Sequence, residues 1–179
     1  MWRQADAQAL PFADAMFDVI ACQFGIMFFP DKAKAAAEAR RVLKPGGTWA
    51  FNVWRSLDDN PIGRIAHDTI ARFFVSDPPT FYNVPFGFSD ERVIRDLLAD
   101  AHFEVATCEV VRRHAQTQNA LDAARGLVMG NPTSMAVTER ATSPIEAVVD
   151  AVAEALVAVG GDHPFSVPMS AMVVVAHAA

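Results

Sequence analysis

Cysteine is scarce in this chain, which has only two among its 179 residues. Cys22 and Cys108 lie far apart inside apolar runs, so we interpret them as small buried residues and predict neither a disulfide nor a metal pair. This usage favours a reducing, cytoplasmic compartment. The sequence also lacks a run of about 18 apolar residues, the length a membrane span requires, and an apolar targeting segment after Met1. We therefore expect a soluble protein that is not exported.

Basic residues are fewer than acidic ones. The chain has 15 Lys and Arg and 21 Asp and Glu, which gives a formal net charge of −6. Nucleic-acid binders usually carry a basic patch that neutralises phosphates, so we expect no nucleic-acid partner. The densest basic groups are short and are interpreted as solvated ends of elements: Arg40 and Arg41 with Lys44, and Arg112 and Arg113 with His114. With 52% hydrophobic residues, the chain is predicted to form a single domain over residues 1–179.

No catalytic motif stands out in the sequence. The five histidines lie far apart and lack metal-ligand spacing, so no metal site is predicted and the catalytic residues stay unknown; they are His67, His102, His114, His163 and His177. If the reaction needs a base, His67 is the candidate, because the pKa of histidine lies near neutrality. The alternative for each histidine is a surface or loop position.

What the sequence does contain is a strand, helix, strand pattern. Residues 17–24 form a nearly continuous apolar run, which is typical of a strand buried on both faces of a parallel sheet. A helix is predicted from 32 to 43, with Asp31 as its N-cap and Pro45-Gly46-Gly47 as its stop. Residues 48–54 predict a second buried strand. Short connections make this a βαβ unit, and such units belong to α/β folds.

The remaining chain alternates irregular and regular segments. Residues 55–88 predict an insertion or lid with one helix at about 62–74, and residues 115–163 predict a second, helical insertion. A helix beginning near Ser89 and Asp90 and strands at 103–112 and 165–176 complete the pattern. On the helix 32–43, Lys34, Glu38 and Arg41 are placed on the solvent side.

Three segments in register carry a family resemblance: Ala5 to Phe12 (ADAQALPF), Phe17 to Gly25 (FDVIACQFG) and Ala39 to Gly47 (ARRVLKPGG). They resemble the middle motifs of class I S-adenosylmethionine-dependent methyltransferases related to ubiquinone and menaquinone biosynthesis C-methyltransferase, also called methyltransferase type 11. The resemblance is close over residues 1–54. It implies a Rossmann-like sheet in the order 3-2-1-4-5-7-6 with helices on both faces and an antiparallel seventh strand. The expected fold class is therefore α/β, with strands 4-5-7-6 of that sheet retained at 17–24, 48–54, 165–176 and 103–112.

The same resemblance implies a cofactor site for S-adenosylmethionine. Asp6 would accept from the exocyclic amine of adenine, and the backbone amide of Ala7 would contact the ring. Cys22, Gln23 and Phe24 would line the far wall. A charged acceptor strengthens a hydrogen bond from an amine, which suits an aspartate to this role. The alternative for Asp6 is a loop acid that caps a turn.

The family's glycine-rich loop and its ribose-binding acid would precede Met1, and no substitute is found. Gly46-Gly47 and Gly160-Gly161 are interpreted as helix ends. Two hypotheses follow: a methyltransferase-like protein acting on an unknown small molecule, or a catalytically inactive remnant of the fold that acts as a dimeric interaction module. Without its neighbouring strands, segment 17–24 is an uncovered sheet edge, which predicts a homodimer. Five aromatic residues are expected either to wall an apolar pocket or to form the core of a lid: Trp54, Phe81, Tyr82, Phe86 and Phe88.

Overall fold

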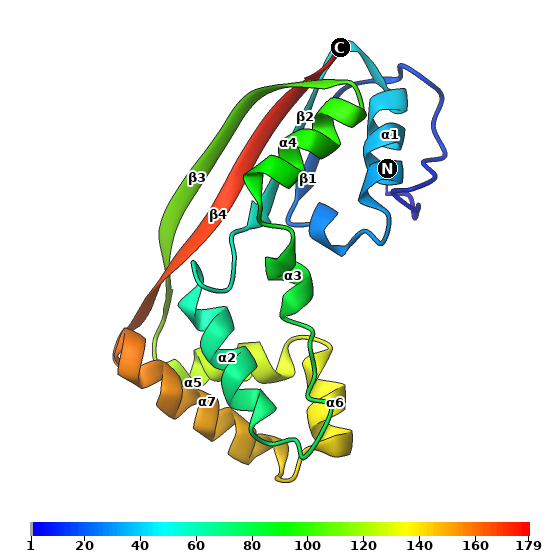
Figure 1. The fold of residues 1–179 in the computed structure, drawn as a ribbon. Helices are drawn as coiled ribbons and strands as arrows, with labels where there is room; N and C mark the ends of the chain where they lie inside the picture. The colour runs from blue at the N-terminus through cyan, green and yellow to red at the C-terminus, as the bar shows by residue number, and fades with distance from the viewer. Residues whose placement is uncertain (1) are drawn as a thin grey trace. The chain divides into compact units, whose positions relative to one another are not determined.

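The structure is a computed structural model that describes residues 2–179 (Figure 1). Its strands are β1 (Phe17–Gln23), β2 (Leu43–Trp54), β3 (Phe103–Thr117) and β4 (Phe165–Ala178). Its helices are α1 (Lys32–Val42), α2 (Pro61–Ala71), α3 (Asn83–Gly87), α4 (Glu91–Asp100), α5 (Ala120–Met129), α6 (Thr133–Arg140) and α7 (Ile145–Gly160), with a short 3-10 turn, η1 (Ile26–Phe28). Every strand and helix expected from the sequence is present, with ends shifted by a few residues.

The described residues form one four-stranded sheet in the order β1-β2-β4-β3. β1 runs parallel to β2, whereas β2 and β4 are antiparallel and pair Thr48 with His177 through Trp54 with Ala171. This order and the antiparallel last strand confirm the expected fold class, strands 4-5-7-6 of a Rossmann-like sheet.

The start of β2 differs from the sequence prediction. Phe17 pairs with Leu43, but Val19 pairs with Thr48, so the residues between them in β2 bulge out of the ladder. Gly46 adopts a φ of +74° within this bulge, a conformation open mainly to glycine. The interpretation of Gly46-Gly47 as a helix end is therefore wrong: α1 ends at Val42 with Leu43 as its C-cap, and the two glycines lie in the bulge of a strand that begins five residues earlier than 48.

The chain divides into two compact units. Unit 1 comprises residues 1–56, 85–111 and 171–179, and unit 2 comprises residues 57–84 and 112–170. The sequence predicted one domain with insertions at 55–88 and 115–163, and these insertions correspond closely to unit 2. Strands β3 and β4 each contribute residues to both units.

Unit 1 has a core between its sheet and two helices. α1 and α4 lie on the same side of the strands (Figure 1), and α1 packs against both α4 and β2. Fully or nearly fully buried side chains of these helices meet those of the strands, among them Ala36, Ile94, Trp49, Val53 and Met172. Alternate residues of β4 from Met172 to Ala178 point into this core, which is the period-two pattern of a strand.

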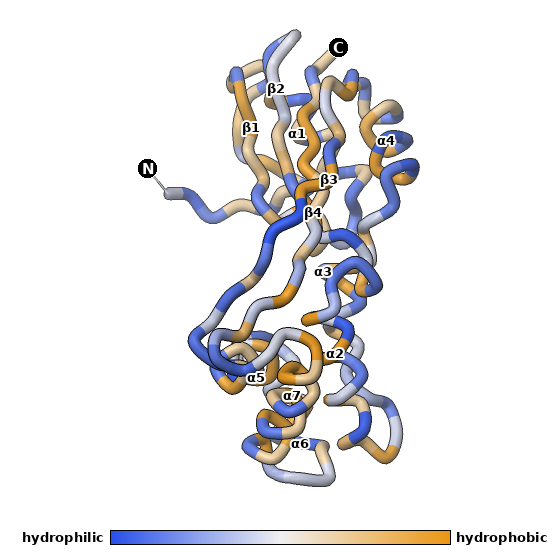
Figure 2. The backbone as a smooth tube through the Cα atoms, turned by 90° about the vertical axis from the view of Figure 1, so that its left-hand side faces the viewer, coloured by the Kyte–Doolittle hydropathy of each residue, from blue (hydrophilic) through white to orange (hydrophobic). Residues whose placement is uncertain are grey.

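The opposite side of β1 is not covered in unit 1. The family resemblance implied helices on both faces of the sheet, whereas α1 and α4 of unit 1 lie on the same face (Figure 1). Val19 is 60% exposed, and Ala21 and Gln23 are also exposed. The prediction that segment 17–24 is buried on both faces is therefore wrong, because β1 is an edge strand with one open face. Figure 2 shows that this open strand is largely hydrophobic.

Unit 2 is built around helices. α7 packs on α5 and α2, and its apolar side chains Val148, Val152 and Leu156 are fully buried. Asn60 precedes α2 and is itself fully buried. Its Oδ1 accepts from the Ser170 backbone N–H at 2.9 Å, and its Nδ2 donates to the Ser170 carbonyl at 3.0 Å. The side-chain amide of Asn60 thus satisfies both backbone groups of Ser170, which is also buried.

The cysteines are free, as predicted, but half-buried instead of buried. The Cys108 thiol lies 3.2 Å from the Met172 sulfur on the neighbouring strand. No cluster of three or more metal-ligating side chains occurs among residues 2–179. Over the same residues, no helix combines the length and the apolar character needed to cross a bilayer.

Candidate functional site

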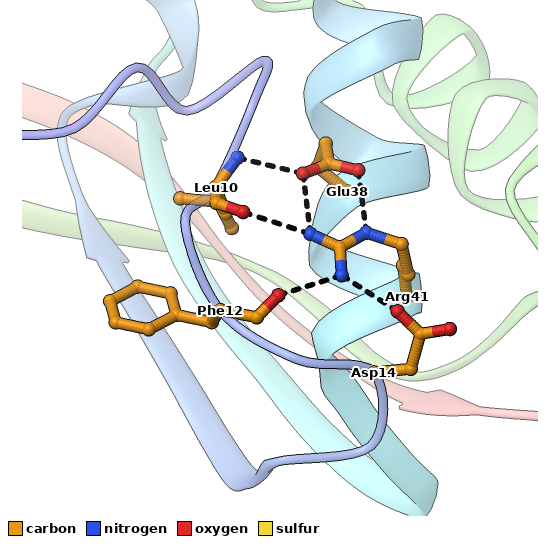
Figure 3. Close-up of polar contacts among 5 residues, drawn as sticks. All are labelled: Leu10, Phe12, Asp14, Glu38 and Arg41. Carbon is orange, nitrogen blue, oxygen red and sulfur yellow. Dashed lines mark hydrogen bonds and ion pairs between the residues drawn. The ribbon is translucent and has the colours of Figure 1, made fainter.

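The loop that precedes β1 is fastened to α1 by one arginine (Figure 3). The Arg41 guanidinium donates to the carbonyls of Leu10, at 2.9 Å, and Phe12, at 2.8 Å. It also pairs with the carboxylates of Asp14, at 2.7 Å, and Glu38, at 2.8 Å. Glu38 in turn accepts from the Leu10 backbone N–H at 2.7 Å. Two side chains of one helix therefore hold three positions of the loop.

This network corrects the sequence interpretation of α1. Glu38 and Arg41 were placed on the solvent side, yet their side chains are only 19% and 32% exposed. The guanidinium lowers the pKa of the Glu38 carboxyl to about 2, chiefly by direct hydrogen bonding. The neighbouring Arg40 is not a free solvated end either, because it donates to the Ala179 carbonyl. A helical pattern places residues relative to the helix axis, and it contains no information about a loop that folds over that side.

Asp6 lies four residues before Leu10, the first loop residue that Arg41 binds. The residue forms an isolated bridge with Ala9, and the Ala9 N–H donates to the Asp6 carbonyl at 3.0 Å. Both the backbone N–H and the side-chain Nε2 of Gln8 donate to Asp6 Oδ1, at 2.9 and 3.2 Å. Both hydrogen bonds lower the pKa of the Asp6 carboxyl, and the bond from the Gln8 backbone has the larger effect. Asp6 is therefore an exposed, ionised acceptor at a tight turn.

The alternative that Asp6 caps a turn therefore holds for one of its two carboxylate oxygens. Oδ1 accepts from the backbone N–H of Gln8, two positions ahead. Such a contact is an Asx turn. The second oxygen, Oδ2, receives no hydrogen bond within residues 2–179. Ala7, the neighbouring residue named for the adenine ring, is half-buried in the same turn.

The end of β1 brings together two of the other predicted site residues. Cys22 and Gln23 line an open depression of about 300 Å³ on unit 1. Its other lining residues come from β1, β2 and β4: Ala21, Ala50, Phe51, Asn52 and Val173. Burial raises the pKa of the Cys22 thiol, so this sulfur is neutral and not a thiolate. Asp6, Ala7 and Phe24 are not among the residues that line it.

Phe24 follows β1 in a left-handed backbone conformation, with a φ of +49°. Its N–H donates to Asn52 Oδ1 at 2.9 Å and to the Asn52 carbonyl at 3.2 Å. Its ring stacks on Trp54 with centroids 4.1 Å apart and planes inclined by 20°. Trp54 also lies 6.3 Å from the ring of Phe86. An aromatic wall therefore stands at the carboxyl ends of the parallel strands β1 and β2, where α/β sheets commonly bind ligands.

In unit 2, the candidate base lies beside a tyrosine. The rings of His67 and Tyr82 meet edge to face, with centroids 6.4 Å apart. The Tyr82 hydroxyl donates to the Leu127 carbonyl at 2.7 Å and accepts from Asn131 at 3.3 Å. Burial raises the pKa of Tyr82 to about 12, which keeps the phenol neutral. His67 Nδ1 is buried and has no hydrogen-bond partner in the described part of the chain.

The aromatic residues of the sequence analysis thus separate into two groups. Trp54, Phe86 and Phe88 belong to unit 1, and Phe81 and Tyr82 belong to unit 2. Sequence reasoning missed Gln8, Glu38 and Arg41 as parts of the site. The three-residue spacing of Glu38 and Arg41 signalled a helix ion pair, but nothing local indicated the loop carbonyls that the pair binds.

Residues 1–51 match the family model described as a methyltransferase domain. An uncharacterised protein of Mycobacterium tuberculosis is 49% identical over 53 residues, which are 30% of this chain and 19% of that protein. A ubiquinone/menaquinone biosynthesis C-methyltransferase of Marinomonas sp. is 57% identical over 44 residues, which are 25% of this chain and 18% of that enzyme. The matching segments therefore span about a fifth of these curated relatives.

Solved structures resemble the chain over nearly all its length. A proposed methyltransferase from Bacillus halodurans aligns with a TM-score of 0.57 and 17% identity, covering 97% of this chain and 69% of that one. The cyclase SpnF aligns with a TM-score of 0.54 and 19% identity, covering 97% and 55%. At these identities the likeness concerns the fold.

Proposed function

We infer that this chain binds S-adenosylmethionine and serves methyl transfer to a small molecule. Its fold is that of class I methyltransferases, and its residues 1–51 match the methyltransferase domain model. The observation that carries this function is the fastened loop before β1. Arg41 and Glu38 hold the loop, and Asp6 presents an ionised oxygen from it. An ionised acceptor beside a backbone amide suits the amine and ring edge of adenine.

The residues described fit the adenine end of this cofactor. Asp6 and Ala7 would hold the base, and Cys22, Gln23 and Phe24 would form the opposite wall. When bound, S-adenosylmethionine supplies an activated methyl group that leaves its sulfonium by in-line displacement. The task of the chain is then to orient the acceptor and exclude water. Phe24 and Trp54 suit this task, because their stacked rings form a dry, rigid surface.

Residues 2–179 offer fewer groups that could bind the ribose end of the cofactor. Gly46 and Gly47 lie in β2, and Gly160 and Gly161 end α7, so neither pair forms a strand-to-helix phosphate-type loop. We propose that these residues by themselves bind the cofactor weakly. The methylated atom and the substrate stay open.

Isothermal titration of the chain with S-adenosylmethionine and S-adenosylhomocysteine tests this function. We expect saturable binding that Asp6→Ala weakens about tenfold, the effect of losing one charge-assisted hydrogen bond. Asp58→Ala is the matched control, because Asp58 is an exposed acid in unit 2. Absence of binding at millimolar ligand would reject the function for this chain.

A second function has support of its own. The edge and open face of β1 favour an interaction module that pairs two copies of the chain as a homodimer. The likeness to a cyclase also fits a module without methyl transfer, since one fold hosts several chemistries. A cytoplasmic location belongs to this proposal, because both cysteines are free.

A further inference from the structure

Gln8 connects the Asp6 turn to the start of α1. Its Oε1 accepts from the backbone N–H of Asp31 at 3.0 Å. A backbone N–H can only donate, so the amide oxygen of Gln8 must face Asp31 and the NH₂ group must occupy the other branch. That branch lies 3.2 Å from Asp6 Oδ1. The helix end therefore dictates which way the Gln8 amide points, and with it the donor that Asp6 receives.

Two donors from Gln8 converge on a single oxygen of Asp6. The backbone N–H and Nε2 both bind Oδ1, at 2.9 and 3.2 Å. An exposed aspartate side chain would otherwise sample several rotamers. Binding of one oxygen from two directions restricts the carboxylate plane and so fixes the direction of Oδ2.

We propose that Gln8 is the positioning residue of the adenine end: it holds the Asp6 carboxylate so that Oδ2 faces the exocyclic amine of the cofactor. This inference rests on the proposed function. Gln8 touches no ligand atom in this role and acts through Asp6. Gln8 contributes preorganisation. Because the Asp6 carboxylate is already ordered in the free protein, binding does not have to supply the entropy cost of ordering it.

The anchor of Gln8 is itself firm. Asp31 is the N-cap of α1, and its carboxylate accepts from the Lys34 N–H at 2.9 Å. Arg41 of the same helix holds the Leu10 carbonyl. Gln8 and Leu10 lie on the C-terminal side of Asp6 and Ala7, and both are attached to α1 or its N-cap. This side of the turn therefore transmits the position of α1 to Asp6 through Gln8.

The test compares two ligands that differ only at one edge of the base. S-adenosylhomocysteine has the exocyclic amine beside an acceptor ring nitrogen, and S-inosylhomocysteine has a carbonyl oxygen beside a ring N–H. Dissociation constants are measured by titration calorimetry for the wild type and for Gln8→Ala. We expect Gln8→Ala to weaken S-adenosylhomocysteine about five- to tenfold, the scale of one hydrogen bond, and to leave S-inosylhomocysteine within about twofold. The preference for the amine ligand therefore shrinks.

Two further variants separate positioning from folding. Gln8→Glu retains an acceptor for Asp31 but cannot donate to Asp6 when ionised, so it should lose amine preference at least as strongly as Gln8→Ala. Gln4→Ala, the same change at an exposed position of the same segment, should leave both constants unchanged. Far-ultraviolet circular dichroism checks that each variant is folded.

The outcomes distinguish the two proposals. A wild type that binds neither ligand rejects the proposed function, and this inference falls with it. A wild type that binds S-adenosylhomocysteine while Gln8→Ala binds it equally well leaves the function standing and overturns the role of Gln8. Equal weakening of both ligands by Gln8→Ala also overturns it, because a merely structural defect does not discriminate amine from carbonyl.

Discussion

At the residue scale, Gly25 is a position where packing leaves no room for a side chain. A Cβ built on Gly25 would stand 2.8 Å from the Cys22 sulfur, although its backbone, with φ −108° and ψ −46°, is open to alanine. Glycine is therefore required here by packing and not by conformation. The contact joins two residues of the motif at the end of β1, which explains in physical terms why a small residue follows Phe24.

We predict that Gly25→Ala destabilises the chain by about 1–3 kcal/mol, the usual cost of overpacking. In a Cys22→Ala background the same change should cost clearly less, because the clashing sulfur is gone. Urea denaturation of the four proteins measures the coupling. Gly126→Ala is the control of opposite sign, since nothing lies within 4 Å of a Cβ there and alanine favours helix α5. An uncoupled cost at Gly25 would contradict the steric explanation.

At the element scale, the attachment of the loop before β1 to α1 depends on the ionisation of Glu38. Its folded-state pKa is lowered from the ordinary value of 4.5 to about 2. A carboxyl with a depressed folded pKa contributes stability that is present above its unfolded pKa and is lost as the pH falls toward its folded pKa. The attachment should therefore loosen between pH 4.5 and pH 2.

Amide hydrogen exchange of Leu10 as a function of pH measures this loosening, because the Leu10 N–H donates to Glu38. In the wild type, after correction for intrinsic exchange rates, protection should fall across that acidic window. Glu38→Gln should be poorly protected at every pH and show no transition there. Glu139→Gln, at an exposed position of α6, should behave like the wild type. A transition that survives in Glu38→Gln would assign the effect to another carboxyl.

At the scale of the whole molecule, the open edge of β1 is the feature with the largest consequence. Its apolar side chains and unpaired backbone groups form a template for another strand. We predict that the chain is a dimer in light scattering and that Val19→Lys, which adds a charge to the exposed face, gives a folded monomer. Val75→Lys is the control, because Val75 is 91% exposed and lies outside the sheet. A monodisperse wild-type monomer would reject the homodimer.

The sequence by itself determined the elements and their order in the sheet. The apolar runs at 17–24 and 48–54 predicted β1 and β2, and Asp31 and Asp90 cap the helices that follow them, as expected. The order of the strands came from three motifs in register with a known family. These features are local, or are inherited with the family, so a linear pattern contains them.

Only the tertiary structure decided which surfaces are covered and which groups meet. The run in β1 has the composition of a buried strand, but its exposure depends on neighbours that the run does not encode. Arg41 reaches the carbonyls of Leu10 and Phe12, 31 and 29 residues away in sequence, and Gln8 reaches Asp31 across 23. A guanidinium or an amide has several donors and no preferred partner in sequence. Its partners are fixed only when the chain folds a distant segment against it.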